Sequence, residues 1–186
     1  MGPDKNQLGK APSGSGKPAT GAVESNTLIA LATLDAQPWK NGGGTTYQIA
    51  ADPPDAGTTD FRWRISRAVI ERDGPFSLFP NVSRWIVLAE GPGFTLEFAD
   101  GTSFDVVKPF EVYWFDGGLG VNCRLKGGRK VTVVNVMAQN DVVMRVNVAQ
   151  SRSALPTAGH AIVSPFGASV RLDERHVVTA LIDRPF

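Results

Sequence analysis

The chain has 186 residues, of which 42% are hydrophobic and 20% charged, and its net charge at pH 7 is +1. This composition excludes a disordered chain, and the length suits one domain with a substantial core. No apolar run approaches the ~20 residues needed to span a bilayer. The balanced charge argues against a nucleic-acid binder. We therefore expect no membrane and no nucleic acid among its partners.

Residues 1–26 are rich in Gly, Pro, Ser and Lys, and we interpret them as a disordered N-terminal arm or a tag remnant. They contain no apolar stretch of the kind found in a secretory signal. The single cysteine, Cys123, suits a reducing compartment. We therefore expect a cytoplasmic location and assign residues 27–186 to one β domain.

From residue 27 onward, short apolar and alternating runs are separated by turns rich in Gly, Pro and Asp. This spacing predicts an all-β sandwich or barrel of the jelly-roll type, with little helix. The expected strands cover 27–34, 45–50, 61–70, 84–90, 93–98, 102–107, 110–115, 121–125, 131–137, 142–149, 168–172 and 176–182.

Strand alternation predicts which side chains share a face. Arg64 and Ser66 are expected on the face opposite Trp63 and Ile65. Asn135 shares its face with two valines and a methionine. A buried amide without partners costs about 1–3 kcal/mol. We therefore expect Asn135 either to meet polar partners inside the protein or to line a cavity.

The chain holds only two histidines, His160 and His176, both near its C-terminal end. No spacing of His and Glu supports a transition-metal site, so we expect no metal and no cofactor. His176 is expected to begin a strand and His160 to lie in a loop. Cys123 is either a nucleophile or a small strand residue packed inside; no histidine lies near it in the sequence.

Three consecutive glycines, Gly42, Gly43 and Gly44, interrupt the stretch WKNGGGTT directly before an expected strand. Two interpretations stay open. The bare backbone N–H groups could form an anion-binding nest beside Lys40. Alternatively, the glycines make a turn that lets two strands pass closely.

The motifs WKNGGGTT, WRIS, DGPFSLFPNVSRWIVLAEGPG, FDGG and CRLKGGRKVTVVNVM follow one another in this order. With this combination the sequence resembles the HutD/Ves family of cupin-like bacterial proteins, by motif over roughly residues 28–137. The resemblance implies a cupin-like fold without the histidine-rich metal motifs of metal cupins. It also implies a link to histidine utilisation in some members and to stress response in others, and no established catalytic mechanism.

The candidate ligand-binding residues combine the motif matches with the predicted strand faces. They are Lys40, Asn41, Gly42, Gly43, Gly44, Thr45, Arg64, Ser66, Arg124 and Asn135. The set contains cations and no acid, and a bidentate arginine is a natural partner for a carboxylate. The alternative is that Arg64 and Arg124 lie on solvated outer faces. Trp39, Phe76 and Phe79 either pack in the core and support a lid, or stack on a ligand.

Three functions remain compatible with the sequence. The first is binding of a small acidic metabolite in a sensing or regulatory role, and the resemblance suggests urocanate, formiminoglutamate or formylglutamate from histidine degradation. The second is a metal-independent lyase, isomerase or hydrolase, with unknown catalytic residues. The third is a non-catalytic module that forms a homodimer. The fold alone does not decide among them.

Overall fold

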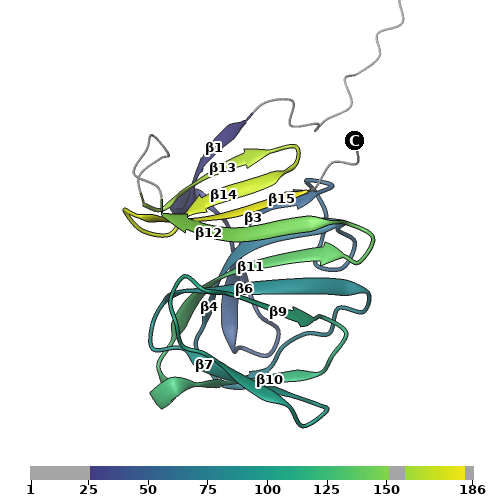
Figure 1. Ribbon diagram of the computed structural model, residues 1–186, viewed down its shortest axis with the longest axis vertical. Helices are drawn as coiled ribbons and strands as arrows, with labels where there is room; N and C mark the ends of the chain where they lie inside the picture. Colours follow the sequence, from purple (N-terminus) through teal and green to yellow (C-terminus); the bar gives the residue numbers. More distant parts are fainter. Residues whose placement is uncertain (1–25, 151–157, 183–186) are drawn as a thin grey trace, which may run out of the picture.

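The computed structural model describes residues 26–150 and 158–182, which fold almost entirely into β-strands (Figure 1). The strands are β1 (Thr27–Ala30), β2 (Ala36–Pro38), β3 (Gly44–Asp52), β4 (Trp63–Ile70), β5 (Gly74–Pro75), β6 (Val82–Glu90), β7 (Phe94–Phe98), β8 (Ser103–Val106), β9 (Val112–Asp116), β10 (Val121–Leu125), β11 (Val131–Gln139), β12 (Met144–Gln150), β13 (His160–Ser164), β14 (Gly167–Arg171) and β15 (His176–Ile182). Two 3-10 turns complete the secondary structure of these ranges, η1 (Leu31–Thr33) and η2 (Lys126–Gly128). Residues 1–25 of the expected arm lie outside the described part.

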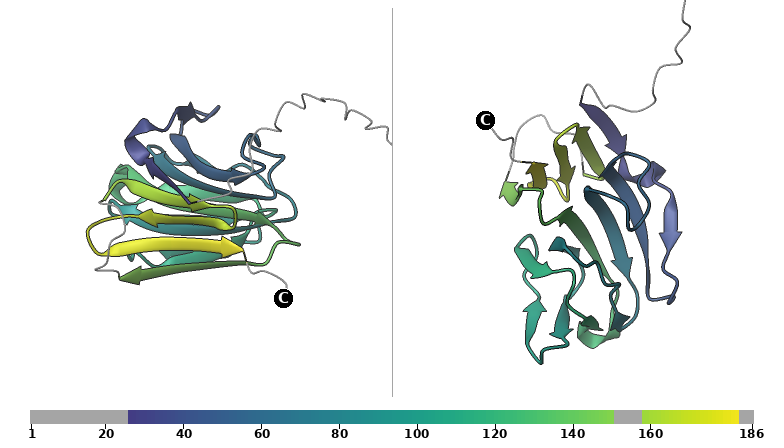
Figure 2. Two further views of the ribbon diagram at one scale, coloured as in Figure 1. Left: turned by 90° about the horizontal axis from the view of Figure 1, so that it is seen from above. Right: turned by 90° about the vertical axis from the view of Figure 1, so that its right-hand side faces the viewer.

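The strands form three antiparallel sheets in layers (Figures 1 and 2). A six-stranded sheet in the middle has the order β2-β3-β4-β11-β6-β9. A four-stranded sheet, β5-β10-β7-β8, covers one of its faces, and a five-stranded sheet, β1-β13-β14-β15-β12, covers the other. The prediction of an all-β fold with little helix is confirmed.

Strand β11 lies at the centre of the middle sheet, paired with β4 on one side and β6 on the other. All its residues from Val131 to Ala138 are buried. A strand covered on both faces reads as a nearly continuous apolar run, which accounts for the sequence VTVVNVMA. The exception in that run, Asn135, is therefore placed inside the protein and not at its surface.

Two apolar cores separate the three layers. Ile65, Val87 and Val136 point from the middle sheet toward the five-stranded sheet. Leu88 and Val133 point toward the four-stranded sheet. Strands β12 to β15 thus cover the face of the middle sheet that points away from the four-stranded sheet, and a second apolar core lies beneath them.

Three strands were not predicted from the sequence. β2 and β5 span 3 and 2 residues, too few to show a period. β13 begins at His160, so the prediction that His160 lies in a loop was wrong. This strand is fixed by pairing with β1, which is far away in the sequence, and with β14. His176 begins β15, as expected. No helix in the described ranges is long and apolar enough to cross a membrane.

Candidate functional site

Several polar side chains lie together on the face of the middle sheet that points toward the four-stranded sheet. Met137 pairs with Arg64 on β4 and with Arg84 on β6, so these side chains form a row across three strands. In the next row, Asn135 pairs with Ser66. Since alternate residues of a strand point to the same face, both rows look toward the four-stranded sheet.

These rows form part of the wall of a cavity of about 490 Å³, within the usual size of a small-molecule site. Its exposed lining residues include those of the segment before β3, the loop before β4 and the loop after β5, and we call this exposed rim the mouth. The lining residues are Gln37, Pro38, Trp39, Lys40, Asn41, Thr46, Thr58, Thr59, Arg64, Ser66, Pro75, Phe76, Ser77, Leu78, Phe79, Arg84, Asn135 and Met137. We call this space the inner cavity.

Arg84 is the most deeply buried cation of the inner cavity, with 4% of its surface exposed. Its guanidinium carbon lies 4.8 Å from the ring centre of Phe115, 5.2 Å from that of Phe76 and 5.5 Å from that of Phe79. Nη1 donates a long hydrogen bond of 3.5 Å to the Ser77 carbonyl. Nε finds no acceptor among the residues that the structure describes. Burial lowers the pKa of Arg84 to about 10, so the side chain stays charged at neutral pH.

Arg64 is also buried, with 5% exposure, and its polar partners are neutral. Nε donates to Oε1 of Gln48 at 2.9 Å, and Nη2 donates to Oε1 of Gln37 at 3.0 Å. Burial lowers the pKa of Arg64. Within residues 26–150 and 158–182, neither Arg64 nor Arg84 forms a salt bridge. The cavity therefore holds two buried positive charges for which the described residues provide no counter-ion.

Asn135 lines the inner cavity, which is one of the two placements expected for it. It is 7% exposed, and its Oδ1 has no hydrogen-bond partner in the described part of the chain. An unpaired buried acceptor costs about 1–3 kcal/mol. Asn135 Oδ1 and Arg84 Nε are thus an acceptor and a donor that no described residue satisfies.

The glycine run forms a turn. Gly42 N–H donates to the Trp39 carbonyl at 2.9 Å, and Gly43 N–H donates to Oδ1 of Asn41 at 3.0 Å. A Cβ atom on Gly44 would lie 2.3 Å from the Val69 carbonyl oxygen of the neighbouring strand. These N–H groups are therefore occupied within the turn, and the close strand approach explains the glycine, so the turn interpretation holds over the nest.

Five predicted site residues do not line the inner cavity: Gly42, Gly43, Gly44, Thr45 and Arg124. Thr46, one residue further along β3, lines it instead and accepts a hydrogen bond from the Trp39 indole at 2.8 Å. Lys40 and Asn41 are exposed residues of the cavity lining. The other expected residues, Arg64, Ser66 and Asn135, also line the cavity.

Arg124 lies on the outer face of β10, where its side chain is 61% exposed and pairs with Glu97 at 2.7 Å. Its neighbour Cys123 points into the barrel core and is fully buried. Burial, with a smaller contribution from the charge of Asp73, raises the pKa of Cys123 to about 12. Cys123 is therefore a protonated core residue at neutral pH, and not a nucleophile of this site.

The three aromatic residues pack against one another or against Arg84, which agrees with the packing role considered for them. Trp39 packs edge-on against Phe76 with 5.9 Å between ring centres. Phe76 and Phe79 also cover the guanidinium of Arg84. They support the mouth of the cavity and hold its buried cation in place, since a cation is attracted to an aromatic face.

Sequence reasoning missed Arg84, Gln37 and Gln48 as site residues. Arg84 could have been found, because Ile86 and Leu88 follow it at the spacing of one strand face. The two glutamines carry no such signal, since their role depends on reaching Arg64 from neighbouring strands. No group of three or more His, Cys, Asp or Glu side chains within the described ranges could hold a metal ion.

The sequence profile of the HutD family matches residues 31–171. An uncharacterized 21.2 kDa protein in the hutC 3′ region of Pseudomonas putida is 42% identical over 91 residues, which cover 49% of this chain and 47% of that protein. Protein Ves of Citrobacter koseri is 38% identical over 103 residues, covering 55% and 52%. The chain thus spans about half the length of the curated relatives it matches.

Two solved structures share the fold. A conserved protein of unknown function from Pseudomonas aeruginosa PAO1 aligns with a TM-score of 0.68 and 20% identity, over 87% of this chain and 95% of that one. HutD from Pseudomonas fluorescens SBW25, solved in a formate condition, aligns with a TM-score of 0.65 and 20% identity, over 86% and 100%. At this identity the likeness concerns the fold alone.

Proposed function

The chain belongs to the HutD family, and on that premise we propose that it binds a small acidic metabolite in the inner cavity, in a sensing or regulatory role. The observation that carries the proposal is the pair of buried arginines, which find no counter-ion in the part of the chain that the structure describes. There, Arg84 meets aromatic faces and one carbonyl, and Arg64 meets two amide oxygens. Burying a charge without a partner is costly, and a bound anion would relieve that cost at both positions.

A carboxylate suits the site better than a simple anion. Each guanidinium presents a planar set of donors that matches the two oxygens of a carboxylate. Arg64 and Arg84 are two strands apart, which places their Cα atoms about 10 Å from each other at the usual strand spacing of ~4.8 Å. This separation favours a ligand with an acidic group at one end and a second polar or acidic group at the other.

Intermediates of histidine degradation are the first ligands to test. Formylglutamate and formiminoglutamate carry two carboxylates, and urocanate carries one carboxylate and an imidazole. The orphan Asn135 oxygen could accept a hydrogen bond from the N–H group that each of them can carry. The assignment to this pathway rests on the family resemblance, and the charge of the ligand rests on the geometry of the cavity.

The lining of the cavity favours binding over catalysis. Among the described residues it contains no His, Asp, Glu, Cys or Tyr, so it offers no carboxylate, imidazole, thiol or phenol that could act as a general acid or base. We therefore keep a metal-independent enzyme as the second candidate function, after ligand binding.

The test is a thermal-shift screen with formylglutamate, formiminoglutamate, urocanate and glutarate, with glutaramide as the uncharged control. A ligand present at 100 times its Kd adds about 2.7 kcal/mol to the free energy of unfolding. We expect at least one carboxylate to raise the Tm while glutaramide leaves it unchanged. NMR of the incubated ligand should show no product. Equal responses to glutarate and glutaramide would contradict an anion site, and a new product would support the enzyme.

A further inference from the structure

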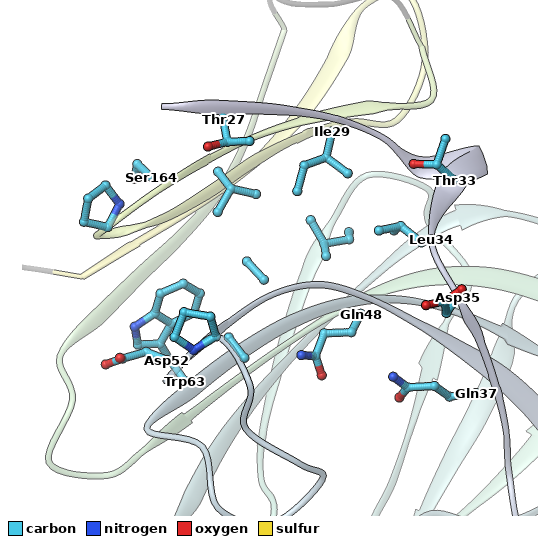
Figure 3. A pocket seen from close by; sticks show the side chains of 16 residues that line it. Thr27, Ile29, Thr33, Leu34, Asp35, Gln37, Gln48, Asp52, Trp63 and Ser164 are labelled. Carbon is cyan, nitrogen blue, oxygen red and sulfur yellow. The ribbon is translucent and has the colours of Figure 1, made fainter. Parts of the chain in front are cut away.

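A second cavity of about 620 Å³ lies between the five-stranded sheet and the edge of the middle sheet (Figure 3). We call it the outer cavity. Its lining residues are Thr27, Ile29, Thr33, Leu34, Asp35, Gln37, Gln48, Ile49, Ala50, Ala51, Asp52, Pro54, Trp63, Val163, Ser164 and Pro165. Gln37 and Gln48 line both cavities, so they form part of the wall between them.

One wall of the outer cavity carries an unused hydrogen-bond donor. Trp63 is only 2% exposed, and its indole Nε1–H has no acceptor among the described residues. Buried indole N–H groups usually find a partner, so this one marks a place for an incoming acceptor.

An acceptor of the protein lies beside this donor. Asp52 pairs with Trp63 across β3 and β4, and Figure 3 shows its carboxylate next to the nitrogen-bearing edge of the indole. Arg62 Nη1 binds Oδ2 of Asp52 at 3.1 Å from outside the cavity. The wall thus presents a donor and an acceptor next to each other.

The charge of the outer cavity is opposite to that of the inner one. Asp35 and Asp52 belong to its lining, and none of the described lining residues is Lys, Arg or His. An anion would be repelled, whereas an uncharged molecule would not. Apolar side chains form much of the remaining wall, among them Ile29 and Leu34 (Figure 3). Ile49 also lines the cavity.

We propose that the outer cavity is a second small-molecule site, which binds an uncharged amide or lactam attached to an apolar body. The carbonyl oxygen of the amide accepts the Trp63 N–H, and its own N–H donates to the Asp52 carboxylate. The apolar body packs on the aliphatic wall. A carboxylic acid of the same shape is rejected, because at neutral pH it brings only acceptors and a negative charge to Asp52.

The four tryptophan indole N–H resonances of ¹⁵N-labelled protein test this site directly. The probe is cyclohexanecarboxamide, and cyclohexanecarboxylate is the control of equal shape. We expect the amide to shift the Trp63 resonance saturably and the carboxylate to leave it in place. Trp39 lines the inner cavity, so its resonance reports binding there and should not respond to the amide.

Variants assign the response. Trp63→Phe should remove the shifted resonance and the binding, whereas Trp114→Phe, the same change at an exposed position, should keep both. Asp52→Asn keeps the shape of the side chain, removes its charge and should weaken the amide about tenfold. If Trp63→Phe fails to fold, Asp52→Asn carries the test. The proposal would be overturned if the amide leaves the Trp63 resonance in place or shifts that of Trp39 instead. It would also be overturned if the carboxylate gives an equal response, or if Asp52→Asn binds the amide with full affinity.

Discussion

Arg84 and Arg64 show how a small number of residues can define a binding site inside an apolar barrel. Each guanidinium is held in place by neutral groups, three aromatic rings for Arg84 and two glutamine oxygens for Arg64. These contacts fix the geometry but do not neutralise the charge. A ligand can therefore supply the negative charge that these arginines lack. While the site is empty, the two unpaired charges lower the stability of the protein.

Gln48→Glu would supply that negative charge from within the protein. The new carboxylate would lie where Oε1 of Gln48 now accepts from Arg64 at 2.9 Å. We expect a higher Tm without ligand and at least a tenfold loss of carboxylate affinity, because a charge-assisted hydrogen bond is worth about 1.5–3 kcal/mol.

Gln150→Glu is the matched control, since Gln150 is exposed at the end of β12. It should change neither the Tm nor the affinity, measured by scanning calorimetry and titration. Unchanged ligand affinity in Gln48→Glu would mean that Arg64 does not contact the ligand.

Strand alternation predicted part of this site from the sequence. It placed Arg64 and Ser66 opposite Trp63, and both faces proved to be buried because the middle sheet is covered on both sides. Arg124 alternates with buried residues in the same way, but only one face of β10 is covered, so the alternative of a solvated outer face holds for Arg124 and not for Arg64.

At the scale of elements, the turn before β3 positions the mouth of the inner cavity. Its hydrogen bonds connect Trp39 to Gly44 and Asn41 to Gly43, and Asn41 Nδ2 also donates to the Pro75 carbonyl at 3.3 Å. Gly44 pairs with Ile70 at the start of the strand. The turn therefore ties β5 to the start of β3 in the middle sheet.

Gly44→Ala should destabilise the protein by about 1–3 kcal/mol, the usual cost of forcing extra atoms into a packed site. The new Cβ would meet the Val69 carbonyl oxygen at 2.3 Å, and a backbone atom cannot move aside cheaply. Gly120→Ala is the control, because its Cβ would make an ordinary contact of 3.4 Å with Ala99. Urea denaturation measures both, and equal midpoints for the two variants would contradict the close approach.

The shortest elements could not be predicted because they have no pattern of their own. β5 comprises Gly74 and Pro75 and is a strand only because it pairs with β10. β2 ends at Pro38 and is fixed by β3. Long strands such as β11 and β15 were predicted well. Most of their residues are buried, so each strand appears in the sequence as an apolar run.

At the scale of the whole molecule, the five-stranded sheet covers a large apolar face of the barrel. Ile65, Val87 and Val136 contact it from the middle sheet. We propose that residues 27–186 fold as one unit for this reason. The sequence indicated strands in this region but not their partner, because pairing between β1 and β13 joins distant segments.

Removing residues 141–186 should therefore leave an aggregating chain, since it exposes that apolar face.

Removing residues 1–25 should leave the Tm nearly unchanged, because their composition offers little apolar area against an ordering cost of roughly 1–2 kcal/mol per residue. Soluble yield and thermal melts compare the two deletions. A soluble, folded 1–140 chain, or a fall of about ten degrees after the N-terminal deletion, would contradict this view.

The central claim is that Arg64 and Arg84 together bind a carboxylate in the inner cavity. Calorimetric titration of formylglutamate into the wild type, Arg64→Lys, Arg84→Met and Arg124→Ala tests it most directly. Arg64→Lys keeps the charge but loses the planar donor pair, and Arg84→Met keeps most of the volume but loses the charge. We predict at least a tenfold weaker Kd for both variants, with a folded protein, and an unchanged Kd for Arg124→Ala. Equal affinity in all four proteins would contradict the claim.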